Sequence, residues 1–201
     1  MLRRLSAVIA ALCLCLSAQA QYHMIGDYSR FVPPAMHMGL GFVGVPTQHA
    51  LLDRTIEETI AYTCAISTGY LLKYTIKRER PDGSDNRSFP SGHTLFAFTG
   101  AELTRMDYGW GWGGGAYAVA VYTGAERIWC NKHWFTDVLA GAGIGILSAH
   151  VGGWLLEPFK DLFGIPTVEW DGFRTKKTQV AFAPCVDPFS NSYLATVSIA
   201  F

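Results

Sequence analysis

The segment Val138–Leu156 carries no acidic or basic side chain apart from His150. As a helix it is just long enough to cross a bilayer, and the same composition suits a buried helix of a bundle. Charges interrupt the other helical patterns, since residues 91–106 include Glu102 and Arg105. We therefore favour burial in a bundle core and keep a membrane helix as the alternative.

The remaining patterns predict a mainly α-helical bundle that ends in a small C-terminal β-hairpin. Residues 193–201 alternate in polarity like a strand, and 178–183 would be its partner across a turn. The Gly- and Pro-rich residues 21–50 predict loops and short helices. The predicted helices are 53–80, 91–106, 116–128 and about 134–156, with a Gly- and Trp-rich loop at 107–115.

The first twenty residues are typical of a secretory signal peptide. Arg3 and Arg4 precede an apolar run from Leu5 to Leu16, and Ala18-Gln19-Ala20 fits a cleavage site. We expect residues 1–20 to be removed on export, although a retained anchor is the alternative. The expected domains are then 21–170, a helical domain, and 171–201, a hairpin extension. An exported chain of this kind would be periplasmic, either soluble or associated with the membrane.

Composition excludes several classes of protein. Half of the residues are hydrophobic and 16% are charged, which excludes a disordered chain. The 16 basic residues balance the 16 acidic ones, so there is no basic excess to favour a nucleic-acid partner. No C-x-x-C pair is present, so a cysteine metal site is not expected. Oligomeric state stays open.

Two segments place polar residues where a helical core does not need them. Lys73 and Arg80 lie at the end of the first long helix, directly before Pro81. Pro90-Ser91-Gly92-His93 opens the next helix, where free backbone N–H groups make a ready anion site. His93, in the first turn, would overhang a bound anion. Alone, each pattern is also compatible with ordinary helix ends.

A third segment contains Arg127, His133 and Asp137. Histidine and aspartate four residues apart share one helix face, so the carboxylate can hold one ring nitrogen and leave the other as a nucleophile or base. A surface ion pair or half of a metal site would use the same spacing. No third ligand is placed nearby by sequence, so we expect no metal here.

Together the three segments resemble the type 2 phosphatidic acid phosphatase (PAP2) and vanadium haloperoxidase superfamily. Lys73-x6-Arg80-Pro81, Pro90-Ser91-Gly92-His93 and Arg127-x5-His133-x3-Asp137 match its motifs in order and spacing, over about residues 55–156. The resemblance implies a helical bundle of the PAP2/chloroperoxidase type and hydrolysis of phosphate monoesters without a cofactor. The substrate would be a phosphate-bearing lipid or a small organic phosphate.

The resemblance also implies residue roles. His133 would attack phosphorus and form a phosphohistidine, Asp137 would orient its ring, and His93 would protonate the leaving group and then activate water. The phosphate would be bound by Lys73, Arg80, Ser91, Gly92 and Arg127. Two other functions stay open: a vanadium-dependent haloperoxidase, against which the short chain argues, and a non-catalytic anion-binding protein of the cell envelope.

One position departs from the family pattern. Glu126 stands where relatives usually have the serine before the arginine of the third motif. A carboxylate pointing inward would repel a phosphate dianion. We therefore expect Glu126 to turn away or to pair with a basic residue, and we expect it to affect substrate preference more than reaction type.

Overall fold

A computed structural model of the protein describes residues 27–166, 179–186 and 193–200. The predicted signal peptide lies outside these residues. The chain divides into two compact units, Met1–Trp170 and Asp171–Phe201, and each is described by itself.

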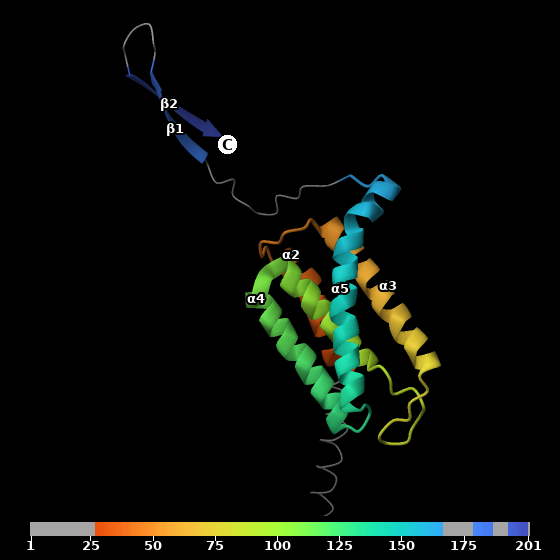
Figure 1. Cartoon of the computed structure of the whole chain (residues 1–201). Coiled ribbons are helices and arrows are strands. Elements are labelled where there is room, and N and C mark those ends of the chain that lie inside the picture. Colours follow the sequence, from red (N-terminus) through yellow and green to blue (C-terminus); the bar gives the residue numbers. More distant parts are fainter. Residues whose placement is uncertain (1–26, 167–178, 187–192, 201) are drawn as a thin grey trace, which may run out of the picture. The chain divides into compact units, whose positions relative to one another are not determined.

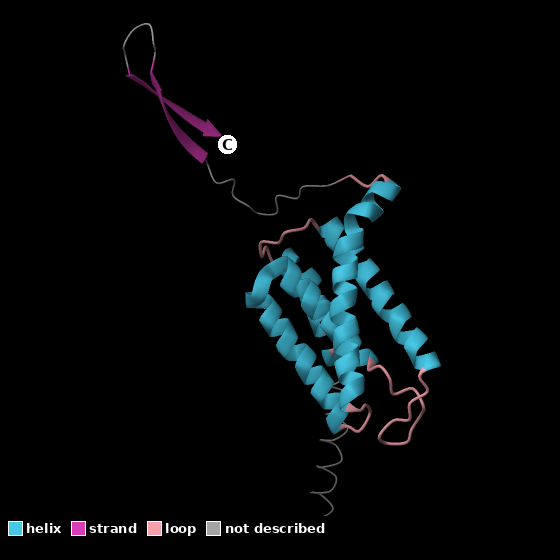
Figure 2. Ribbon diagram, in the orientation of Figure 1, coloured by secondary structure: helices cyan, strands magenta, loops and turns pink. Residues whose placement is uncertain are grey.

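The first unit is a bundle of helices, which confirms the predicted mainly α-helical fold (Figure 1; Figure 2). A short helix, α2, begins with prolines, whose fixed φ and missing N–H suit a first helical turn. Helix α5 packs against α4 and α3, and α2 packs mainly on α4. The helices are α2 (Val32–Phe42), α3 (Leu51–Thr75), α4 (Gly92–Trp129) and α5 (Phe135–Phe163).

Several helix boundaries differ from the sequence prediction. Helix α5 continues through Pro158 to Phe163, beyond the predicted end near residue 156. Helix α3 ends at Thr75 instead of Arg80, which releases Lys77–Arg80 into a loop. The predicted loop at 107–115 is wrong, because α4 is interrupted only at Gly109 (φ 75°, ψ −176°). This positive φ is readily adopted by glycine alone, so one residue reverses the direction of α4 and no loop is needed.

Small residues let the helices approach closely. A Cβ added at Gly141 of α5 would lie 2.6 Å from the Ser91 carbonyl oxygen, and one at Gly145 would lie 2.6 Å from that of Leu95. A Cβ at Gly100 would lie 2.5 Å from the backbone nitrogen of Pro34. The contacts of α5 and α2 with α4 are therefore between backbones, a packing mode common where helices meet in membranes.

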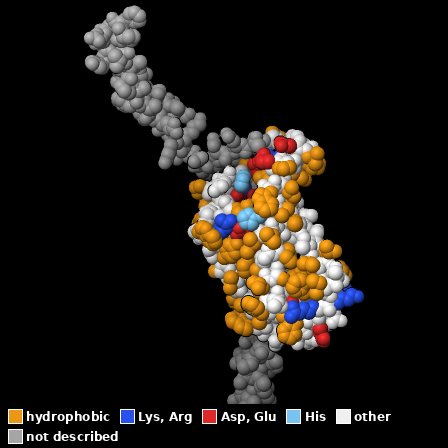
Figure 3. Space-filling model, viewed as in Figure 1, with side chains coloured by type: hydrophobic (Ala, Val, Ile, Leu, Met, Phe, Trp, Pro, Cys, Tyr) orange, Lys and Arg blue, Asp and Glu red, His pale blue; other side chains and the backbone are white. Residues whose placement is uncertain are grey.

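Large apolar side chains lie on the outside of the same bundle. Leu139, Leu147 and Trp154 of α5 are exposed, and hydrophobic side chains follow the length of the visible face (Figure 3). Helix α5 is the one helix among the described residues that is long and apolar enough to cross a membrane, with a mean hydropathy of 1.5. Only 28% of this apolar window is buried. Burial in a bundle core, which we favoured from the sequence, therefore does not account for most of this apolar window of α5.

The second unit contains an antiparallel hairpin of β1 (Gln179–Val186) and β2 (Tyr193–Ala200). Gln179 pairs with Ala200, and Val186 with Tyr193. Strand β1 continues through Pro184 to Val186, three residues beyond the predicted end at residue 183.

Candidate active site

The three motifs meet at one end of the bundle, the lower end in Figure 1. The end of α3, the loop before α4, both ends of α4 and the start of α5 come together there. We call this set of side chains the histidine site. It consists of Lys73, Arg80, Ser91, Gly92, His93, Arg127, His133 and Asp137.

His133 is 3% exposed and lies in the short turn between α4 and α5. Its Nδ1 donates to the Ser88 carbonyl oxygen at 2.7 Å, which leaves Nε2 with a lone pair. Burial, together with the positive charges of Arg80 and Lys73, lowers the pKa of His133 to about 3. With this pKa the ring is neutral at physiological pH, and its Nε2 lone pair is available.

Asp137 is fully buried in the first turn of α5, and other groups occupy both of its carboxylate oxygens. Oδ1 accepts from Arg78 at 2.8 Å, while Oδ2 accepts from the Ser88 hydroxyl and from the Trp134 backbone N–H. The distance from Oδ2 to His133 Nδ1 is 3.9 Å, too long for a hydrogen bond. The ring is thus oriented by the Ser88 carbonyl, and Asp137 acts on it only through its charge.

His133 and Asp137 do not share a helix face as expected, because α5 begins at Phe135. Asp137 instead accepts from the N–H of Trp134, the residue that caps the helix. A carboxylate at this position satisfies a backbone donor that has no partner within the helix. The capping role explains why Asp137 points back toward the turn that carries His133.

Lys73 and Arg80 enter the site from the end of α3 and the loop after it. Lys73 Nζ donates to the carbonyl oxygens of Arg87 and Pro90, at 2.9 and 2.7 Å. Burial and the nearby Arg80 lower the pKa of Lys73 to about 8. Arg80 is held by Asp85, whose Oδ1 accepts from Nε at 2.8 Å. Both cations are fixed by the loop and do not need to reorganise when an anion arrives.

Ser91 and Gly92 form the start of α4. Ser91 is buried, its N–H donates to the Asp137 carbonyl oxygen, and its hydroxyl oxygen accepts from Thr94. A Cβ added at Gly92 would lie 3.9 Å from Lys73 Cε, so the helix N-terminus is next to the ammonium group. Helix dipole and ammonium charge thus favour an anion at the same place.

His93 lies opposite, between two arginines. Its Nε2 is 3.1 Å from Arg30 Nη1 and 3.4 Å from Arg127 Nη1. Burial and these two guanidinium groups lower its pKa to about 4. Asp27 Oδ1 is 3.0 Å from both His93 Nε2 and Arg127 Nη1. The Asp27 carboxylate thus bridges His93 and Arg127, which shows that these two side chains can bind an anionic oxygen together.

Glu126 pairs with its neighbour, one of the two outcomes expected from the sequence. Its Oε2 accepts from Arg127 Nε at 2.5 Å, and its Oε1 accepts from Cys130 Sγ at 3.1 Å. The carboxylate is fully buried and directed at these groups. Arg127 Nη2 is also buried and has no hydrogen-bond partner among the described residues, so it stays available for an anion.

Sequence reasoning missed four residues at this site: Arg78 and Ser88, which hold Asp137, and Asp27 and Arg30, which contact His93. Arg78 is indistinguishable by sequence from other basic residues at a helix end. Asp27 and Arg30 precede the first motif by more than forty positions, so no spacing connects them to it.

The family model of the PAP2 superfamily matches residues 7–158. The chain belongs to the PAP2 superfamily. The crystal structure of Aquifex aeolicus LpxE has the same fold, with a TM-score of 0.55 and 22% identity over 67% of this chain and 84% of that chain. The predicted resemblance and the predicted PAP2-type fold are confirmed.

Two curated relatives are similar over part of the chain. A lipid A 1-phosphatase of Porphyromonas gingivalis is 46% identical over 87 residues, which are 41% of this chain and 19% of that protein. The bacitracin transport permease protein BcrC of Bacillus licheniformis is 40% identical over 67 residues, 32% of this chain and 31% of that protein. This PAP2 chain thus matches between a fifth and a third of their length.

Proposed function

We propose that this PAP2 protein is an exported phosphatase that hydrolyses phosphate monoesters through a phosphohistidine on His133, without a metal ion. The observation that carries the proposal is the state of the His133 ring. The ring is neutral, its Nδ1 is engaged by Ser88, and its free Nε2 lies near Lys73 and Arg80. A neutral imidazole beside fixed cations suits attack on an anionic phosphoryl group.

In the first step His133 Nε2 forms a bond to phosphorus as the bond to the ester oxygen breaks. His93 supplies the proton that the leaving alkoxide takes up. In the second step His93 takes a proton from water, whose oxygen attacks phosphorus. The P–N bond then breaks, and inorganic phosphate and neutral His133 are released. Lys73, Arg80 and Arg127 stabilise the charge on the phosphoryl oxygens in both steps.

The partners of Asp137 support the absence of a metal from this reaction. Both of its oxygens are engaged by Arg78, Ser88 and the Trp134 N–H, so His133 and Asp137 do not present a joint pair of ligands. Cations of the protein surround the site instead. They supply the positive charge that a metal ion provides in other phosphatases.

A phosphate-bearing lipid is the substrate class that we favour. One curated relative is a lipid A 1-phosphatase by name and the other a transport permease protein, and the bundle carries large apolar side chains on its outside. The histidine site lies at one end of this apolar bundle, where a lipid headgroup would meet it. A small organic phosphate is the other substrate class. The site itself recognises the phosphoryl group common to both.

Phosphate release by the purified full chain in EDTA tests the proposed function. We expect release from phosphatidate in detergent and from p-nitrophenyl phosphate, with the lipid turned over faster. His133→Ala, purified in the same way, is the background control. No release from either substrate above that control would contradict a phosphatase. It would favour a non-catalytic anion-binding protein. Release that stops in EDTA and returns with added metal would contradict a metal-free reaction.

We further propose that α5 crosses a membrane, with the histidine site beyond its N-terminal end. Exposed Leu139, Leu147 and Trp154 would then contact lipid, which removes apolar area from water. After cell fractionation the protein is expected in the membrane pellet, and it should stay there through alkaline carbonate but dissolve in detergent. Release by carbonate would contradict a spanning helix and indicate a peripheral protein.

A further inference from the structure

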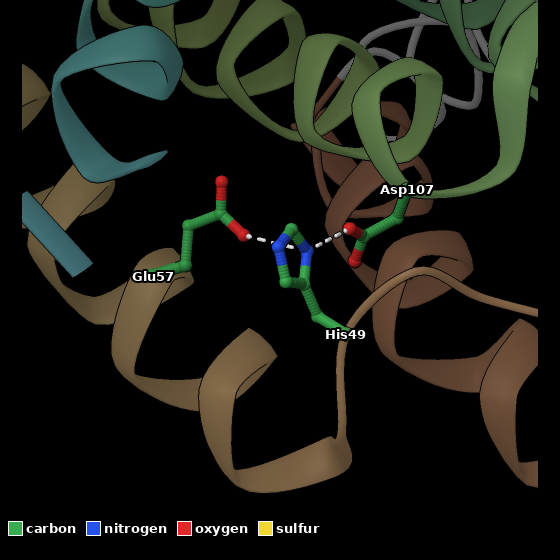
Figure 4. Close-up of side chains that lie close together, drawn as sticks. All are labelled: His49, Glu57 and Asp107. Atoms are coloured by element: carbon green, nitrogen blue, oxygen red, sulfur yellow. Dashed lines mark hydrogen bonds and ion pairs between the residues drawn. The ribbon is translucent and has the colours of Figure 1, made fainter. Parts of the chain in front are cut away.

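A second cluster of ionisable side chains lies at the other end of the bundle (Figure 4). It consists of His49, in the segment between α2 and α3, Glu57 of α3, and Asp107 of α4, and we call it the His49 cluster. Glu57 and Lys73 are separated by roughly 24 Å along α3, at about 1.5 Å per residue. The proposed hydrolysis therefore does not use this cluster.

Glu57 is the unexplained member of the His49 cluster. Its side chain is 1% exposed, and neither carboxylate oxygen has a hydrogen-bond partner among the described residues. Asp107, a second buried carboxylate, faces the same histidine. A buried carboxylate without a donor is costly, so a cation or a proton must compensate it.

In the part of the chain that the structure describes, no buried basic side chain near Glu57 donates a hydrogen bond to it. His37, Arg54 and Lys160 are all buried, and none donates to Glu57. Arg54 Nε and Nη2 also have no hydrogen-bond partner among the described residues. The Glu57 carboxylate therefore has no donor from these three side chains, and its nearest basic group is His49 at 3.8 Å. The partners are Glu58 and Asp107 for His37, Asp53 and Glu157 for Lys160, and the His37 carbonyl and Tyr108 hydroxyl for Arg54.

We propose that the His49 cluster binds a divalent transition-metal ion of the zinc class. Imidazole nitrogen and carboxylate oxygen are both ligands that zinc accepts, and the imidazole distinguishes this set from the all-oxygen sites of Mg²⁺ or Ca²⁺. His49 Nδ1 lies 2.7 Å from Asp107 Oδ1 and 3.8 Å from Glu57 Oε2. Ligand atoms around one tetrahedral zinc are roughly 3.3 Å apart. The two distances bracket that value, and all three ligand atoms lie within 4.8 Å of one another.

The surroundings of the His49 cluster suit such an ion. The His49 side chain is 35% exposed, which opens a route from solvent and leaves room for water as a fourth ligand. The second oxygen of Asp107 accepts from His37 Nε2 at 2.9 Å, and a hydrogen bond of this kind fixes the direction of a metal-binding carboxylate. His49 lies on a loop, so its ring can move by the few tenths of an ångström that coordination needs.

The ion would act as a structural clamp. It would connect the loop before α3, the first turns of α3 and the part of α4 directly before the break at Gly109. Binding to the folded chain alone stabilises it, in proportion to the logarithm of the free metal concentration. Zinc near 100 times its Kd is expected to raise the Tm by roughly 5–10 °C.

The test uses the full chain in detergent, stripped with EDTA and dialysed into phosphate-free buffer. Zinc titration calorimetry should give one site per chain, Co²⁺ should give the visible absorption bands of a tetrahedral site, and zinc should raise the Tm. Absence of these three effects would overturn the proposal and leave a proton on Glu57 as the compensating charge. None of the readouts requires phosphatase activity, so they stand apart from the proposed function.

Two variants assign the site. Glu57→Gln, close in shape, and His49→Ala should abolish zinc binding and the Tm rise. His150→Ala is the matched control, because His150 is also 35% exposed and also pairs with a carboxylate, that of Glu102. It should bind zinc like the unaltered chain. Zinc binding that survives both cluster variants, for instance at free thiols, would overturn the assignment.

Discussion

His133→Ala is expected to lower kcat on every phosphate ester by at least ~10⁴-fold, because it removes the nucleophile. His93→Ala should behave differently, because its effect depends on the leaving group. An alkyl phosphate needs a proton on the departing oxygen, so its kcat should fall about 10²–10⁴-fold. p-Nitrophenolate leaves without one, so attack by His133 on that ester should continue.

The two histidines can be separated by rapid mixing with p-nitrophenyl phosphate. The His93→Ala phosphoenzyme has lost the group that activates water, so we expect a burst of one p-nitrophenol per active site followed by slow turnover. His133→Ala should give no burst, and His150→Ala should turn over like the unaltered enzyme. A burst in His133→Ala, or the absence of a burst in His93→Ala, would contradict these roles.

The pH dependence of kcat and kcat/KM follows from the protonation of His93. In the free enzyme the pKa of His93 is lowered to about 4, so the acid is lost from kcat/KM as the pH rises above that value. A bound phosphate favours the protonated ring and raises this pKa. The basic limb of kcat should therefore lie at higher pH than that of kcat/KM. If the basic limbs of kcat and kcat/KM coincide, the bound phosphate does not raise the pKa of His93.

Gly141→Ala is expected to damage both stability and activity. Its methyl group would lie 2.6 Å from the Ser91 carbonyl oxygen and 3.2 Å from the Leu95 backbone nitrogen. Overpacking of this kind costs about 1–3 kcal/mol, which corresponds to a fall in Tm of roughly 2–10 °C. It should also displace Ser91 and His93, and a shift of about 1 Å can lower kcat by ~10²-fold.

Gly143→Ala is the matched control on the same helix. A Cβ at Gly143 has no heavy atom within 4 Å, so alanine meets open space there. Alanine has a better helix propensity than glycine, which can increase the free energy of unfolding by up to about 1 kcal/mol. The Tm should therefore stay unchanged or rise. Thermal unfolding and kcat on p-nitrophenyl phosphate measure both variants. Equal behaviour of the two would contradict the close contact of α4 and α5.

The sequence by itself determined the helical class and the family, and it predicted the chemistry of the three motifs. Helical class follows from long apolar stretches, which any chain with this pattern must bury or place against lipid. Chemistry follows from motif spacing, because Lys73–Arg80, Ser91–His93 and Arg127–Asp137 each lie on a single short segment. The pairing of Glu126 with a basic residue was foreseeable too, since a buried carboxylate needs a donor.

Only the tertiary structure decided which groups hold His133 and what else the bundle contains. Ser88 and Arg78 engage His133 and Asp137 through a loop whose path no local pattern specifies. Gly109 breaks α4 at one residue because of a positive φ that several glycines in 107–115 could have adopted. His49, Glu57 and Asp107 come from three separate elements, and only close helix packing brings their ligand atoms within 4.8 Å. Contacts between distant segments depend on how backbones fit together, which the spacing of residues along the chain does not encode.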